Sequence, residues 1–162
     1  MKLNNDILNM KLFIPEISTI ITLSKDWHLK LYCEHRNTTL AKKLNIIPSS
    51  YKEHITWPQQ FTDPIEQQQV TTWNKHCYSA DISFDITLES NTQLRLDRIY
   101  IRKGKKDFSS LSFWIINGKY KGSRFWAKLE DCNNIELLEP EINLNDVFKP
   151  LTQMYKKMRG KR

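Results

Sequence analysis

The chain has 162 residues, which suffices for one domain, or one domain with a substantial extension, without disulfide support. Its composition is 40% hydrophobic and 27% charged, with a net charge of +7, and this predicts a folded protein with a polar surface. The glycines all follow residue 103, at Gly104, Gly118, Gly122 and Gly160. These positions exclude a dinucleotide-binding glycine turn and a phosphate-binding loop, and neither a nucleophile elbow nor an H-E-x-x-H helix is present.

Targeting signals and paired cysteines are not found either. The apolar stretch Leu12–Leu23 is interrupted by Pro15, and no run of residues is long enough to span a bilayer. The cysteines, Cys33, Cys77 and Cys132, are odd in number and lack a paired spacing, so we expect reduced thiols. The sequence therefore predicts a cytoplasmic protein that does not contact a membrane.

The N-terminal half mixes strand and helix patterns. Apolar residues alternate within Thr19–Leu23 and Trp27–Cys33, and Ser24–Asp26 between them predicts a hairpin turn. The helical spacing within Leu40–Ile47 predicts a short helix, with Asn37–Thr39 as its cap.

A second helix is predicted after a proline-containing loop over residues 48–62. The Asp63 side chain is expected to accept hydrogen bonds from the free backbone N–H groups at the start of this helix. Pro64 fits the first turn, and Glu66 occupies the position where a capping box has an acid. The apolar stripe of this helix is Val70, Trp73 and Cys77.

From residue 80 the apolar period changes to two. Ile82–Leu88 reads as a strand, and Glu89–Thr92 as a turn. In the next strand the apolar positions change phase at Asp97-Arg98, which predicts a β-bulge. Further inward rows are expected at Leu111, Phe113 and Ile115 and at Phe125, Ala127 and Leu129, with Gly118 and Gly122 in the hairpin loop between them.

The chain is predicted to end in three short elements. Leu129–Asn134 reads as one helical turn and Ile135–Leu138 as a last strand, and a helix from about Asn145 is expected to pack on the barrel.

The order of these elements resembles a known small fold. The segments that show the resemblance are a strand–turn–strand (Ile86–Leu96), a loop (Arg102–Ser109), a hairpin (Asn117–Ser123), and Arg124–Leu129 leading into Asp131–Ile135. Over residues 81–138 this pattern resembles an SH3-like small β-barrel, with an OB-like barrel as the alternative. The sequence lacks the acidic-aromatic cluster of SH3 peptide grooves, so recognition of proline peptides is not implied.

The predicted fold class is α+β, with three parts. Residues 1–79 form a strand-hairpin and helix part, 80–140 the small barrel, and 141–162 a basic C-terminal helix or tail.

The basic residues are concentrated in two segments. Residues 95–128 carry ten basic residues against Asp97 and Asp107, a net charge of +8, and residues 149–162 carry six basic residues and no acid. On the side of the barrel opposite the apolar rows, strand alternation places the candidate binding residues Arg95, Tyr100, Arg102, Trp114, Arg124, Trp126 and Lys128, beside the loop residues Lys103, Lys105 and Lys106. Cations neutralise phosphates and aromatic rings stack on bases, so this face is typical of a nucleic-acid binder.

Structural interpretations compete with these functional ones. Trp114 and Trp126 could instead be buried under the N-terminal half or the C-terminal helix. In the tail, Lys156, Lys157 and Arg159 are a second candidate phosphate contact, against the alternative of a solubilising terminus.

The sequence gives little evidence for a catalytic site or a metal site. Cys33, His35, His76 and Cys77 formally provide a zinc set, but their spacing does not fit one, and we expect no metal and no cofactor. Asp97 is expected to pair with Arg95 or Arg98 rather than to hold a divalent ion.

The sequence therefore predicts a small basic accessory protein that binds DNA or RNA without being an enzyme. The alternative is a protein-binding module or inhibitor, and heavy use of Lys, Ile and Asn suits a phage- or plasmid-encoded factor. The oligomeric state is left open.

Overall fold

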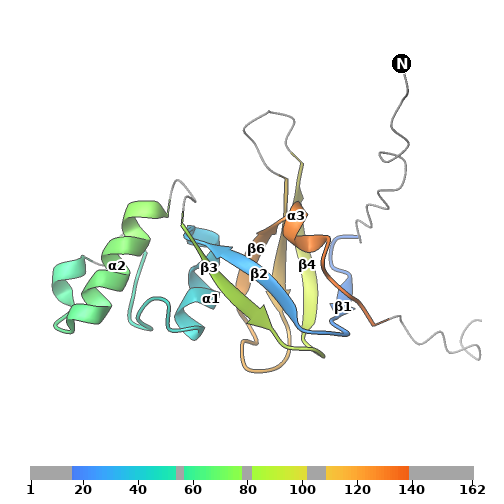
Figure 1. Ribbon diagram of the computed structural model, residues 1–162, viewed down its shortest axis with the longest axis horizontal. Helices are drawn as coiled ribbons and strands as arrows, with labels where there is room; N and C mark the ends of the chain where they lie inside the picture. Colours follow the sequence, from blue (N-terminus) through green and yellow to red (C-terminus); the bar gives the residue numbers. More distant parts are fainter. Residues whose placement is uncertain (1–15, 54–56, 78–81, 102–108, 139–162) are drawn as a thin grey trace, which may run out of the picture.

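A computed structural model describes residues 16–53, 57–77, 82–101 and 109–138, in which antiparallel strands combine with short helices (Figure 1). This arrangement confirms the predicted α+β class. The strands are β1 (Ile20–Thr22), β2 (Trp27–Tyr32), β3 (Ser83–Leu88), β4 (Gln93–Tyr100), β5 (Ser110–Ile115) and β6 (Arg124–Lys128). The helices are α1 (Thr38–Lys43), α2 (Pro64–His76) and α3 (Leu129–Cys132), with the 3-10 turns η2 (His35–Asn37) and η3 (Pro58–Gln60).

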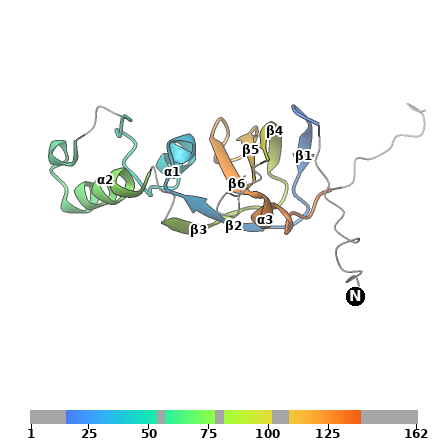
Figure 2. The ribbon, with the colours of Figure 1, turned by 90° about the horizontal axis from the view of Figure 1, so that it is seen from above.

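The strands form two sheets that belong to one bent ribbon. One sheet has the order β1-β4-β5-β6 and the other consists of β2 and β3. Ile20 lies opposite Arg95 in the first sheet, and Trp27 lies opposite Leu88 in the second. Each step forward from β1 to β2 is thus matched by one step back from β4 to β3, so the pairing register is continuous across the bend. At the bend, the Asp26 carboxylate accepts a hydrogen bond from the Ser90 N–H at 2.8 Å. Because the ribbon bends there, β2 and β3 cross the inner face of the four-stranded sheet (Figure 2).

The predicted hairpin around Ser24–Asp26 is wrong. Both strands exist, but β1 pairs with β4 and β2 with β3. Alternation identifies a strand and its buried face, but it does not identify the partner strand, which here lies more distant in the chain. Strand pairing thus links the ranges 1–79 and 80–140.

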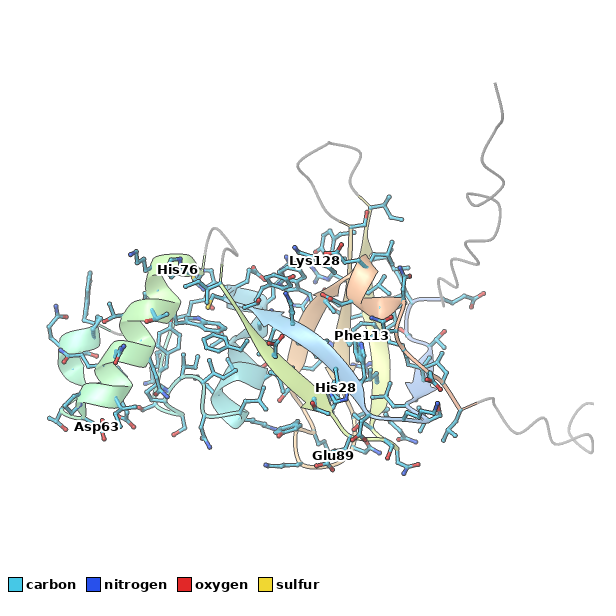
Figure 3. The ribbon with its side chains drawn as sticks, viewed as in Figure 1. His28, Asp63, His76, Glu89, Phe113 and Lys128 are labelled. Atoms are coloured by element: carbon cyan, nitrogen blue, oxygen red, sulfur yellow. The ribbon has the colours of Figure 1, made fainter. Side chains whose placement is uncertain are left out.

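The core lies between the two sheets. Trp27 of β2 meets the rings of Phe113 and Phe125 at centroid distances of 5.9 and 6.0 Å (Figure 3, which labels Phe113). Its indole Nε1 donates to the Asp131 carbonyl at 3.1 Å, which fixes α3 at the end of the core. The one-turn helix predicted near residue 129 is therefore confirmed, whereas the expected last strand is reduced to a single bridge between Leu23 and Leu137.

Helix α2 begins as its cap predicts. The Asp63 carboxylate accepts from the N–H groups of Ile65 at 2.7 Å and Glu66 at 3.3 Å, and Pro64 opens the first turn. The predicted apolar stripe is buried at Val70, Trp73 and Cys77.

The predicted β-bulge is confirmed. The β4–β5 register shifts between Leu96 and Arg98, so Asp97 is the extra residue. Beyond it, Arg98 faces Ser112 and Tyr100 faces Ser110. The hairpin that follows turns at Gly118 and Gly122, whose φ angles of 68° and 80° lie in the left-handed region that glycine adopts without strain.

Side chains, rather than strand pairing, bridge the gap between β2 and β6. In the part of the chain that the structure describes, the sheets do not close into a hydrogen-bonded barrel. The buried Asn37 amide donates to the Tyr32 carbonyl at 2.9 Å and accepts from the Trp126 N–H at 2.8 Å. Asn37 occupies the N-cap position of α1, as predicted, but its side chain spans this gap and makes no hydrogen bond to the helix. The SH3-like resemblance remains a prediction.

None of the described helices is both long and apolar enough to cross a membrane. The helix expected from about Asn145 lies outside the described residues.

Candidate nucleic-acid interface

The candidate interface is the outer face, meaning the side of the four-stranded sheet that points away from β2 and β3. Pairing aligns Ile20, Arg95, Trp114 and Arg124 in one row across the four strands. Arg95 is exposed, and Trp114 beside it is partly exposed. An indole ring therefore lies between two cross-strand arginines.

A second group of polar side chains surrounds the bulge. The Asp97 carboxylate contacts Arg124 Nη2 at 2.7 Å and Arg98 Nε at 3.6 Å. The expected pairing of Asp97 with Arg98 is thus confirmed, although Arg124 is the nearer partner. Among the described residues, Arg95 forms no ion pair, so its guanidinium is available to an external anion.

Tyr100 adds an aromatic hydroxyl to this group. Arg98 Nη1 donates to the Tyr100 hydroxyl at 3.4 Å. This hydrogen bond is the main cause that lowers the pKa of Tyr100, and the charges of Arg98, Arg36 and Arg124 act in the same direction. The lowered pKa indicates a positive potential at this end of the outer face.

Trp126 shares the face, but the prediction that its ring is open for stacking is wrong. Only 1% of Trp126 is exposed. Its ring stacks on Tyr32 at a centroid distance of 5.2 Å and an interplanar angle of 9°, and Nε1 donates to the Glu34 carboxylate. The chain segment that leaves β2 wraps round the β6 edge and covers the ring. The alternative of burial under the N-terminal half is therefore confirmed for Trp126.

Several outer-face residues were missed from the sequence. The Arg36 guanidinium lies 5.2 Å from the ring centroids of both Tyr100 and Trp126, and Lys128 Nζ lies 4.5 Å from that of Tyr32. Nothing in the sequence places residues 32–36 beside β6. Arg98 could have been found, because a one-residue bulge at Asp97 returns it to the side of Tyr100.

The remaining predicted contacts cannot be placed on this face. The candidates Arg102, Lys103, Lys105, Lys106, Lys156, Lys157 and Arg159 lie outside the described residues.

A thiol, an imidazole and a carboxylate meet away from the outer face. Cys77 Sγ lies 3.0 Å from His35 Nε2, and His35 Nδ1 lies 2.5 Å from Glu53 Oε1. Burial, followed by the charges of Glu53 and Glu34, raises the pKa of Cys77 to about 11, so the thiol is protonated at neutral pH and is a poor nucleophile. Across the described ranges, His, Cys, Asp and Glu side chains form no group of three with metal-binding geometry.

We expect the buried thiols to make the fold sensitive to alkali. Burial raises the pKa of Cys33 and Cys77 to about 11 and that of Cys132 to about 12, from 9.0. Because the folded pKa values are the higher ones, this stability is complete below pH 9 and is lost as pH rises toward 11–12. Urea midpoints measured from pH 8 upward should fall above pH 9 and fall less in Cys132→Ala. Equal losses in both proteins would contradict a contribution from Cys132.

Comparison of the chain with known protein families, with curated proteins and with solved structures finds no match.

Proposed function

We propose that the protein binds nucleic acid, without catalysing a reaction, through the outer face of its four-stranded sheet. The observation that carries this proposal is the row in which the partly exposed Trp114 lies between Arg95 and Arg124. Stacking on an indole ring needs no particular base, and the exposed guanidinium of Arg95 beside the ring suits a phosphate.

The charge of the outer face favours an anionic partner. Its basic side chains are Arg36, Arg95, Arg98, Arg124 and Lys128, and its acids, Asp97 and Glu34, are already paired with arginines. A base is proposed to stack on Trp114 while Arg95 and Arg98 contact the backbone. Single strands fit best, because their bases are free to leave the stack.

The cellular setting proposed for this activity is the cytoplasm. The thiols are free, buried at Cys33 and Cys77 and partly exposed at Cys132, which is compatible with that compartment.

The test is a comparison of two tryptophan variants. The full chain is titrated at low salt into a fluorescein-labelled oligothymidine 20-mer, and binding is followed by anisotropy. Loss of one stacked base in Trp114→Ala should weaken binding about 5- to 100-fold. Trp57→Ala is the matched control, because Trp57 is 66% exposed on the η3 segment, away from this sheet.

Two results would contradict the proposal. One is no binding by the unaltered protein at low salt, which would favour a protein partner because exposed arginines and tyrosines also suit protein interfaces. The other is equal loss in the Trp114 and Trp57 variants. Trp114→Phe keeps an aromatic face and should retain most of the affinity.

A further inference from the structure

The outer edge of β3 carries unpaired backbone groups. Cys33 N–H donates to the Ile82 carbonyl at 2.9 Å. Ile82 and every second residue after it therefore form the backbone hydrogen bonds from β3 to β2. By alternation, the N–H and C=O groups of Ser83, Asp85 and Thr87 point away from β2. Within the described ranges, β3 has no neighbour on that side (Figures 1 and 2).

Both edges of the four-stranded sheet are covered. At β1, Ser24 N–H donates to the Glu136 carbonyl at 2.9 Å, and Leu138 N–H donates to the Thr22 carbonyl at 2.9 Å. At β6, the Thr39 hydroxyl exchanges hydrogen bonds of 2.8 and 2.9 Å with the Arg124 backbone. Natural sheets usually protect their edges in such ways, and an edge left open, as on β3, is suited to pairing with a strand of another chain.

An apolar hollow adjoins the same strand. Its volume is about 250 Å³, its walls include Ile65, Trp73 and Phe84, and Gln68 and Gln69 line it as well. Phe84 belongs to β3 and points to the inner side of that strand, opposite Leu31 of β2. A strand added to β3 would bring its own inward side chain next to Phe84, at the hollow.

The charges near the edge select the partner. Asp85 and Glu89 are exposed on β3 and just after it, and Asp63 and Glu66 flank Ile65 of the hollow (Figure 3 labels Asp63 and Glu89). In a symmetric antiparallel pair of β3 edges centred on Asp85, this carboxylate would lie opposite its own copy, and like charges across strands are destabilising. Lysine or arginine in a partner strand would instead complement these acids.

We propose that β3 is a docking edge for an extended segment of a partner protein, with basic residues facing solvent and a large apolar residue facing the hollow. The segment adds to the β2–β3 sheet as a third strand, by backbone hydrogen bonds to Ser83, Asp85 and Thr87. This surface is distinct from the outer face proposed to bind nucleic acid.

The probe is a synthetic peptide of sequence Lys-Val-Lys-Phe-Lys-Val-Lys, compared with the same peptide carrying glutamate for lysine. Amide exchange of the full chain is measured by mass spectrometry, and affinity by calorimetry. The lysine peptide should slow exchange in Ser83–Leu88 and bind at least several-fold more tightly than the glutamate peptide. Unchanged exchange in this strand would overturn the proposal, and so would strong protection of the Ser83, Asp85 and Thr87 amides before any peptide is added.

Two variants separate the edge from its charge. Asp85→Pro removes an N–H that points away from β2 and leaves the β2 ladder intact, and it should weaken peptide binding about tenfold. Asp85→Lys keeps every backbone group and should invert the preference between the two peptides, which tests the proposal even if the proline variant does not fold. Binding unaffected by either change would overturn it, as would a dimer in sedimentation that Asp85→Pro dissociates, because the edge would then serve a second copy of the chain.

Discussion

Replacing Trp126 with alanine is expected to destabilise the fold by about 3–5 kcal/mol, the range typical of a fully buried tryptophan. The ring is 1% exposed, stacks on Tyr32 at 5.2 Å and lies under Arg36. The substitution also leaves the Glu34 carboxylate without the indole N–H that donates to it. Denaturant unfolding, followed by circular dichroism, measures the loss.

Trp126→Phe is the matched variant, because it keeps a ring against Tyr32 and loses only the indole donor and part of the volume. Its loss should be smaller, about 1–3 kcal/mol, because Arg36 still donates to the Glu34 carboxylate after the indole N–H is removed. If Trp126→Ala were as stable as the unaltered protein but bound nucleic acid poorly, Trp126 would be a binding residue and not a buried structural one.

Asn37→Ala is expected to cost about 2–4 kcal/mol, because two buried backbone groups each lose a partner. The Asn37 side chain is the link between the Tyr32 carbonyl and the Trp126 N–H, where no strand pairing joins β2 to β6. Its removal should also loosen the cover over Trp126. Thermal and urea unfolding measure the first effect, and quenching of tryptophan fluorescence by acrylamide measures the second.

Asn133→Ala serves as the control, because Asn133 is exposed at the end of α3 and its loss should change stability by no more than about 0.5 kcal/mol. A loss for Asn37→Ala as small as that of the control would mean that the gap between β2 and β6 is held by other contacts.

The sequence was sufficient to predict the local features of the fold. The phase change at Asp97-Arg98 located the bulge, and Asp63 located the start of α2, because each depends on residues close together in the chain. The outward register of Arg95, Trp114 and Arg124 followed from the same alternation.

Contacts between distant segments could not be predicted in this way. Alternation showed that Trp126 points away from the core, but it could not show that Tyr32 and Arg36 cover the ring. These residues lie about 90 positions earlier in the chain, as does Glu34, which accepts a hydrogen bond from the indole. For the same reason, the pairing of β1 with β4 and the bridging role of Asn37 depend on a bend that no local pattern reports.

The salt dependence of binding shows whether arginines on the outer face contact phosphates. For a single strand, each phosphate contact contributes a slope of about −0.7 to log K against log salt concentration. With Arg95 and Arg98 engaged, we expect a slope of about −1.4 for the full chain and a slope less steep by about 0.7 in Arg95→Gln. Absence of binding at low salt, or binding whose slope is the same in Arg95→Gln, would contradict phosphate contact by these arginines.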